Sequence, residues 1–236
     1  MKVFAISDLH LSTVHPKPMD IFGDHWANHV ERLSKEWSET VSPGDLVLVP
    51  GDISWAKELD EAIPDLEWIH QLPGLKILLK GNHDYWWHSA TKVRQILPSS
   101  LMILQYDAIK IRSLGIGGTR GWILPGASEY NSRENDGKDQ LVYTREIGRL
   151  MRSLEALVKL KTEIRLVMCH YPPLWTTQPD TEITALLEQY QVNFCVYGHI
   201  HHPADIPFFE GHHRGVEYWL VACDYLQFRP RLICEL

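Results

Sequence analysis

Short apolar runs alternate with longer helix-patterned stretches through the first hundred residues of this 236-residue chain. The runs cover residues 2–7, 46–49 and 76–79, and each has the length of a buried strand. Between them, residues 25–38 and 59–71 repeat apolar side chains at helical spacing. A third helix is expected to start near Ser89, because serine is a good N-cap residue. This alternation predicts βαβ units and therefore an α/β fold.

The rest of the chain has strand-like runs that lie closer together. The predicted strands are 102–104, 109–112, 114–117, 165–169, 194–197, 205–207, 216–221 and 231–235. The predicted helices are 140–160 and 181–190, and a polar loop covers 121–137. We find no internal repeat, low-complexity tract or linker in the sequence. Because one α/β domain routinely reaches this length, we expect residues 1–236 to form a single domain.

The balance of acidic and basic residues indicates which kind of substrate or partner the protein can bind. The chain has 23 Lys and Arg against 30 Asp and Glu, a net charge of −7, and no run of five basic residues. Long nucleic acid is therefore not the expected partner. A small phosphorylated substrate fits, because bound cations would neutralise some of the acidic residues. No pattern indicates an oligomeric state.

The sequence also predicts where the protein works. Apolar residues make up 44% and charged residues 22%, so neither disorder nor a membrane span is expected. The first residues are too briefly apolar for a signal peptide, and the four cysteines show no CxxC spacing. We therefore expect a cytoplasmic protein with buried free thiols.

Polar motifs stand where the first two predicted strands end. Asp8 and His10 follow the first strand, and residues two apart on a strand point to one face, so both side chains can reach the same cation. Gly51 and Asp52 follow the second strand, where glycine permits a sharp turn and the carboxylate could bridge two cations. Either motif alone also fits an ordinary loop.

A third motif, Gly81-Asn82-His83-Asp84, follows the third strand and combines three kinds of side chain. The Asn82 amide oxygen can ligate a metal ion. The adjacent His83 imidazole can transfer a proton, and the Asp84 carboxylate beside it can hold that ring in one tautomer. A turn rich in cap-forming residues is the alternative interpretation.

Histidines complete the set after two later strands. His170 follows the predicted strand 165–169, and His199 and His201 follow the strand 194–197. A single histidine at a strand end is usually structural. Three of them, together with two aspartates and an asparagine at five strand ends, form a mixed nitrogen and oxygen ligand set for metal ions.

A glycine-rich loop at 115–122 contains Arg120, whose guanidinium matches the geometry of two phosphate oxygens. We consider Arg120 a candidate phosphate clamp, with a solvated turn arginine as the alternative. Four tryptophans lie near a motif or this loop, and they fit either an aromatic wall for the substrate or core packing. They are Trp55, Trp86, Trp87 and Trp122.

The five motifs in this order, from Asp8 to His201, resemble the calcineurin-like metallophosphoesterase superfamily, in particular a compact bacterial branch of predicted phosphohydrolases. The resemblance implies a four-layer α/β/β/α sandwich of two mixed sheets flanked by helices. It also implies a centre of two metal ions, with manganese expected and iron and zinc as alternatives. One metal would take Asp8, His10 and His201, the other Asn82, His170 and His199, and Asp52 would bridge them.

The resemblance further implies that His83 assists the leaving group and that Asp84 supports it. A hydroxide that bridges the two metals would attack phosphorus, and this equipment suits phosphodiesters at least as well as monoesters. A small nuclease is an alternative, although the acidic charge counts against it. A non-catalytic metal-binding scaffold of the same fold is another, and the presence of His83 argues against it.

Overall fold

The computed structural model describes residues 1–126, 136–201 and 208–236. Its strands are β1 (Lys2–Ala5), β2 (Leu46–Pro50), β3 (Leu75–Leu79), β4 (Leu101–Leu104), β5 (Ala108–Ile111), β6 (Leu114–Thr119), β7 (Ile164–Cys169), β8 (Phe194–Tyr197), β9 (Gly211–His213), β10 (Val216–Leu220) and β11 (Arg231–Glu235). Its α-helices are α1 (His29–Thr40), α2 (Ile63–Gln71), α3 (Ala90–Ile96), α4 (Asp136–Lys159) and α5 (Glu182–Gln189). Two 3₁₀ turns, η1 (Met19–Phe22) and η2 (Asp24–Trp26), precede α1. The predicted strand at 205–207 and most of the predicted polar loop lie outside the described residues.

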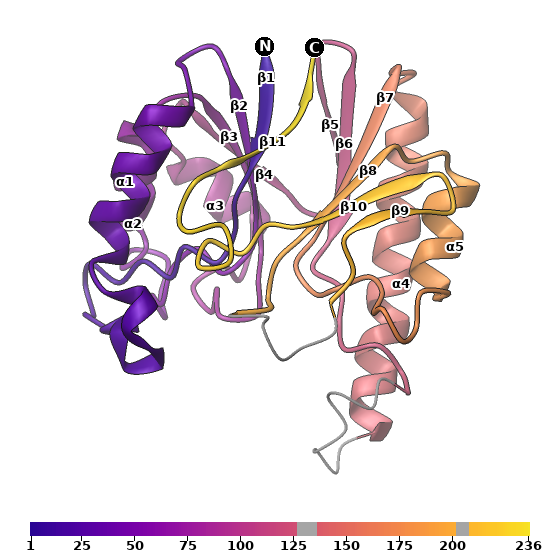
Figure 1. The fold of residues 1–236 in the computed structure, drawn as a ribbon, viewed down its shortest axis with the longest axis horizontal. Helices are drawn as coiled ribbons and strands as arrows, with labels where there is room; N and C mark the ends of the chain where they lie inside the picture. The colour runs from indigo at the N-terminus through magenta and orange to yellow at the C-terminus, as the bar shows by residue number, and fades with distance from the viewer. Residues whose placement is uncertain (127–135, 202–207) are drawn as a thin grey trace.

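The strands form two sheets that face each other (Figure 1). The first has the order β11-β1-β2-β3-β4, with β1 to β4 parallel and β11 antiparallel to β1. The second has the order β5-β6-β7-β8-β10-β9, with four parallel inner strands and an antiparallel strand at each edge. Helices α1 and α2 cover the outside of the first sheet, and α4 and α5 that of the second. The predicted four-layer α/β/β/α sandwich of two mixed sheets is confirmed.

Alternation along the strands explains these layers, because successive side chains of a strand point to opposite faces. In β1, Val3 and Ala5 point into the cluster between the two sheets. Phe4 points the other way, into the cluster beneath α1 and α2 that also contains Leu33 and Trp37. Strands buried on both faces read as continuous apolar runs, which is why the sequence shows them so plainly.

Three helices begin four residues away from the prediction, and α4 is one of them, beginning at Asp136 instead of residue 140. Helix α1 begins at His29 instead of residue 25, because Asn28 adopts the left-handed conformation at φ 52° and interrupts the helical path. Helix α2 begins at Ile63 instead of residue 59, with Pro64 in its first turn, where proline is tolerated. Among the described helices, none is both long and apolar enough to cross a bilayer.

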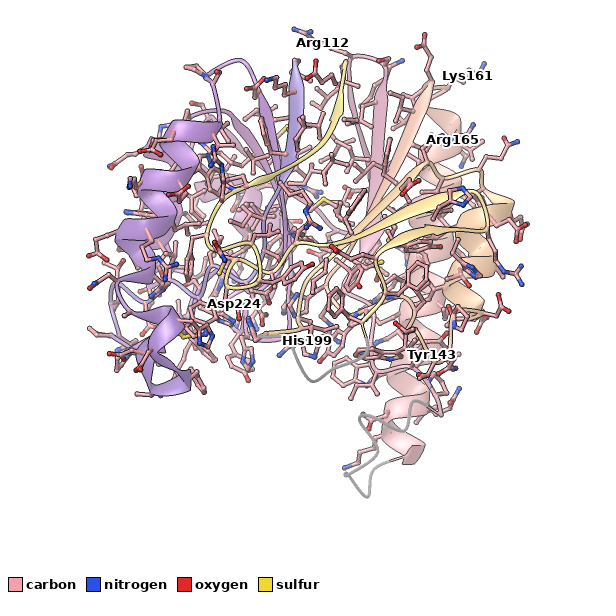
Figure 2. All side chains as sticks on the ribbon, in the orientation of Figure 1. Arg112, Tyr143, Lys161, Arg165, His199 and Asp224 are labelled. Atoms are coloured by element: carbon pink, nitrogen blue, oxygen red, sulfur yellow. The ribbon has the colours of Figure 1, made fainter. Side chains whose placement is uncertain are left out.

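The parallel strands of both sheets end at the same edge of the sandwich, the lower one in Figure 1. Figure 2 shows His199 and Asp224 toward this edge, and Arg112 and Lys161 at the opposite one. The loops that follow β1, β2, β3, β7 and β8 therefore meet, and they carry the five polar motifs.

Candidate metal centre

The motif residues converge into two adjoining clusters. Within each cluster, one ligand atom from every residue lies within 4.8 Å of the others. The clusters are Asp8, His10 and His201, and Asp52, His170 and His199. Each cluster combines loops from both sheets.

Asp52 lies between the clusters and presents one carboxylate oxygen to each. Its Oδ2 is 3.9 Å from His10 Nε2, and its Oδ1 is 3.4 Å from His170 Nε2. Asn82 joins the second cluster, with its Oδ1 2.6 Å from His170 Nε2. The structure thus brings all seven predicted ligand residues together at one edge of the sandwich.

The backbone reaches this arrangement by left-handed turns, not by strand alternation. Strand β1 ends at Ala5, and φ is 60° at Asp8 and 47° at His10. Asp52 and His199 are also left-handed, at φ 53° and 71°. Asp8 and His10 converge as predicted, but the predicted cause, a spacing of two residues on a strand, was wrong. Non-glycine residues in this region cost on the order of 1–3 kcal/mol each and concentrate at functional sites.

Backbone hydrogen bonds hold the strained turns in place. The Asp8 N–H donates to the Gly51 carbonyl at 3.0 Å, and the His10 N–H donates to the Asp52 carbonyl at 3.1 Å. The loops after β1 and β2 therefore continue the sheet pairing past the ends of their strands. This pairing fixes Asp8, His10 and Asp52 relative to one another before any ligand binds.

Two motif glycines are required by close approach of candidate ligands. A Cβ at Gly81 would overlap the Asp52 carboxylate and backbone nitrogen, and one at Gly198 would overlap the carboxylate of Asp8. In both cases the overlap lies far inside van der Waals contact. The glycines thus make room for carboxylates that belong to other loops.

Gly198→Ala is therefore expected to destabilise the fold by about 1–3 kcal/mol, the usual cost of overpacking a dense site. Gly148→Ala is the matched control, since nothing lies within 4 Å of a Cβ added there on helix α4. It should stabilise the protein by about 0.5–1 kcal/mol, the usual gain of alanine over glycine inside a helix. Urea unfolding of both variants measures the difference. Equal unfolding midpoints for the two variants would show that the Asp8 carboxylate moves aside from the new methyl group without a cost in stability.

Burial and mutual charge set the ionisation of the site. Burial raises the pKa of Asp8 to about 6. Burial also acts to raise the pKa of Asp52, but the neighbouring His170 outweighs it and holds that pKa well below its usual range. In return, Asp52 overcomes burial at His170 and raises its pKa to about 9. Burial lowers the pKa values of His10 and His199 far below normal, so both rings are neutral, the form that ligates metals.

Second partners orient two of the imidazoles. His170 Nδ1 donates to the Pro50 carbonyl at 3.0 Å, and His201 Nδ1 donates to Asp224 Oδ1 at 3.1 Å. Each bond leaves Nε2 directed to the centre, as expected of metal-ligating histidines. We did not predict Asp224, although it follows β10 as the other acidic residues follow their strands, and that position was the available signal.

His83 lies at the open side of the clusters. Its Nε2 is 3.9 Å from Asp52 Oδ2, its side chain is 34% exposed, and its ring lies 4.4 Å from the Trp55 ring between centroids. The exposed ring is therefore placed to meet a ligand bound at the clusters.

Asp84 does not orient the His83 ring, contrary to the prediction. His83 Nδ1 is buried and has no hydrogen-bond partner among the residues that the structure describes. The Asp84 carboxylate is instead wholly buried and accepts four hydrogen bonds. The donors are the backbone N–H groups of Ile53 at 2.9 Å, Ser54 at 3.1 Å and Gly81 at 2.8 Å, and Trp86 Nε1 at 3.1 Å. Asp84 thus fastens the loop after β2 to the loop after β3.

A cavity of about 630 Å³ opens beside the clusters. His10, His83 and His201 form its polar wall. Its other lining residues include Met19, Phe22, Trp26, Trp55 and Tyr85. Of the four tryptophans singled out in the sequence, Trp55 lines this cavity, whereas Trp86 and Trp87 are fully buried in the core of the first sheet.

Arg120 does not line that cavity. Its guanidinium lies 4.6 Å from the Trp122 ring and 3.8 Å from the Glu146 carboxylate, and its side chain is 20% exposed. It is therefore not a freely solvated turn arginine, and it lines a second cavity.

The donor set fits metal ions. It mixes imidazole nitrogens with carboxylate and amide oxygens, which suits zinc, iron and manganese alike. His10 Nε2 and His201 Nε2 face each other at 3.2 Å, close enough for both nitrogens to bind one cation. Fold and donor set together define an α/β protein equipped to bind metal ions.

Residues 1–203 match the family model described as calcineurin-like phosphoesterase, and the chain belongs to that family. A phosphopantetheinyl hydrolase from Mycobacterium tuberculosis has a similar fold, with TM-score 0.60, 16% identity, and 100% of this chain and 96% of that one covered. A protein of unknown function from Aquifex aeolicus aligns with TM-score 0.51 and 14% identity over 98% and 95% of the two chains. The Gene 66 protein of Mycobacterium phage L5 is 39% identical over 80 residues, which span 33% of this chain and 37% of that relative.

Proposed function

We propose that this protein hydrolyses a phosphoester with two bound metal ions, and that it favours phosphodiesters over monoesters. The position of Asp52 carries the proposal, because its two oxygens face separate clusters of histidine and acidic residues. Membership of a phosphoesterase family supports the reaction class. We further propose that residues 1–236 work as one domain.

In this proposal, Asp8, His10 and His201 hold one metal, Asn82, His170 and His199 hold the other, and Asp52 is shared. We expect manganese, with iron and zinc as alternatives. When bound, such a pair supplies a water of lowered pKa and neutralises the charge of the phosphate. The protein's own part is to keep seven ligand side chains in register. The left-handed turns contribute to this, as do the hydrogen bonds that His201 and His170 donate to Asp224 and Pro50.

His83 would donate a proton from Nε2 to the departing oxygen of the ester. Its ring is the partly exposed imidazole next to Asp52, and it stands on the cavity side of the clusters. Asp84 would act indirectly, by fixing the loop that carries both Asn82 and His83. We therefore assign Asp84 a positioning role.

The aromatic cavity supports a diester substrate. A diester carries two organic groups, and the cavity offers apolar surface for one of them directly beside His83. Lys17 Nζ lies 3.1 Å from the centroid of the Trp55 ring and adds one positive charge at the mouth. We propose a small phosphorylated compound with an apolar or aromatic substituent as the substrate. We also propose a cytoplasmic location, which fits the four free cysteines.

Hydrolysis of bis-p-nitrophenyl phosphate by the manganese-loaded protein tests this function. We expect turnover that a chelator abolishes and added Mn²⁺ restores, and a higher kcat/KM than with p-nitrophenyl phosphate. Metal binding without turnover of either ester would indicate a scaffold. Nicking of supercoiled plasmid in a parallel reaction would indicate the nuclease alternative.

A further inference from the structure

A second cavity, of about 260 Å³, lies beside the carboxyl ends of β3, β4 and β6 and against helix α4. Four cationic side chains line it: Lys80, Arg120, Arg145 and Arg149. Its volume is several times the ~30 Å³ that one water molecule occupies in the liquid. A phosphate group with some of its hydration therefore fits inside.

Positive charge is in excess around this cavity, within a chain whose net charge is −7. Glu146 is the acidic partner of Arg149 and lies 3.8 Å from Arg120. Lys80 Nζ donates to the Trp87 carbonyl at 2.6 Å, and exposed Arg145 forms no ion pair with the acidic groups that the structure describes. The four cations are therefore only partly neutralised. Such a concentration of like charge lowers the free energy of a bound anion.

The guanidinium groups are held in place before any anion arrives. Arg149 lies 4.3 Å from the Tyr106 ring, and Arg120 stacks in the same way on Trp122. Glu146 is 2% exposed and is itself fixed by a 2.6 Å hydrogen bond from the Thr119 hydroxyl. Fixed, planar guanidinium groups match the paired oxygens of a phosphoryl group and lose little side-chain entropy on binding.

Two residues that line this cationic cavity are joined through the backbone to residues of the candidate metal centre. Lys80 precedes Asn82 by two residues on the loop after β3. The Arg120 carbonyl accepts hydrogen bonds from the backbone of His170 at 3.0 Å and of Tyr171 at 2.9 Å. The aromatic cavity is lined mainly from the loop after β1, and the cationic cavity is lined from β3, β4, β6 and α4, so the two cavities have different walls.

We propose that the cationic cavity binds a second phosphoryl group of the substrate, while the phosphoester to be cleaved lies at the metal centre. This inference rests on the proposed function and deepens it. The substrate class would then be a diester whose organic part carries a further phosphate. Arg120, the predicted clamp, would serve this second group, not the scissile one.

The test uses the double variant Arg145→Met/Arg149→Met, with Arg112→Met as the control. Arg112 is exposed at the opposite edge of the sandwich, so its replacement removes charge without touching the cavity (Figure 2). First, inorganic phosphate is titrated calorimetrically into metal-stripped protein, which separates the cavity from the metals. We expect the double variant to bind phosphate at least about tenfold more weakly than the wild type and the Arg112 control, since two of the four cations are gone.

Second, manganese-loaded protein hydrolyses thymidine 5′-(p-nitrophenyl phosphate) and its 3′-phosphorylated counterpart. We expect the added phosphate to lower KM about tenfold in the wild type and the control, and to give no advantage in the double variant. Equal KM values in the wild type would overturn the inference and leave a site for free phosphate only. Absence of phosphate binding by the stripped wild type would overturn it as well. If the manganese-loaded wild type turned over neither ester while the metal-stripped wild type bound phosphate normally, the result would instead refute the proposed function.

Discussion

Asp52→Ala is expected to reduce the metal content from about two ions per chain to well below one, and to reduce phosphodiester turnover more than about 10³-fold. One carboxylate that serves both clusters cannot be removed without weakening each of them. The measurement is elemental analysis of protein that has been loaded with Mn²⁺ and desalted. Circular dichroism of the same sample checks that the fold persists.

Asp60→Ala is the control for Asp52, because it removes an exposed carboxylate a few residues along the same loop. It should keep both ions and full turnover. If Asp52→Ala also kept two ions, the shared-ligand assignment would be wrong. If it kept one, Asp52 would belong to a single cluster.

His83→Gln is expected to lower turnover about 10²–10⁴-fold for esters with basic alkoxide leaving groups, the usual contribution of a general acid. The loss should be much smaller with p-nitrophenolate, which departs readily without a proton. Metal content should not change, since His83 lies outside both clusters. A series of leaving groups with rising pKa measures the difference as a steeper dependence in the variant.

His15→Gln serves as the control for His83, because His15 pairs with Glu61 at the surface and its side chain is 57% exposed. Its leaving-group dependence should follow the wild type. An equal loss for good and poor leaving groups in His83→Gln would remove the proton-donor role. Loss of metal in that variant would make His83 a ligand.

The sequence predicted the α/β class and the composition of the candidate centre, because buried strands and the polar residues at their ends can be recognised in it. Buried parallel strands appear as apolar runs, and their carboxyl ends share one edge of a sheet. Asp8, Asp52, Asn82, His170 and His199 could therefore be placed together without coordinates. Neither the topology of two facing sheets nor the split into two clusters followed from these runs; both came from the resemblance.

Tertiary details escaped prediction because they depend on neighbours distant in the chain. Two partners of Asp84 are backbone groups of another loop, and no local pattern distinguishes them from the adjacent His83 ring. Strand β9 is a short polar edge strand that carries no apolar signal and exists through its pairing with β10. The left-handed turns at Asp8 and His10 likewise require the hydrogen bonds that their N–H groups donate to the loop after β2.

The division of the centre between two sheets determines when the protein can acquire its metals. On the proposed assignment, both sites need a histidine from the loop after β8, which is synthesised long after Asp8, His10 and Asp52. The earlier residues offer one imidazole and several oxygens, fewer nitrogen ligands than the complete set and therefore a weaker site. Metal insertion would therefore follow the closing of the sandwich, and the ions available to the finished protein, not to the growing chain, would decide which metal it carries.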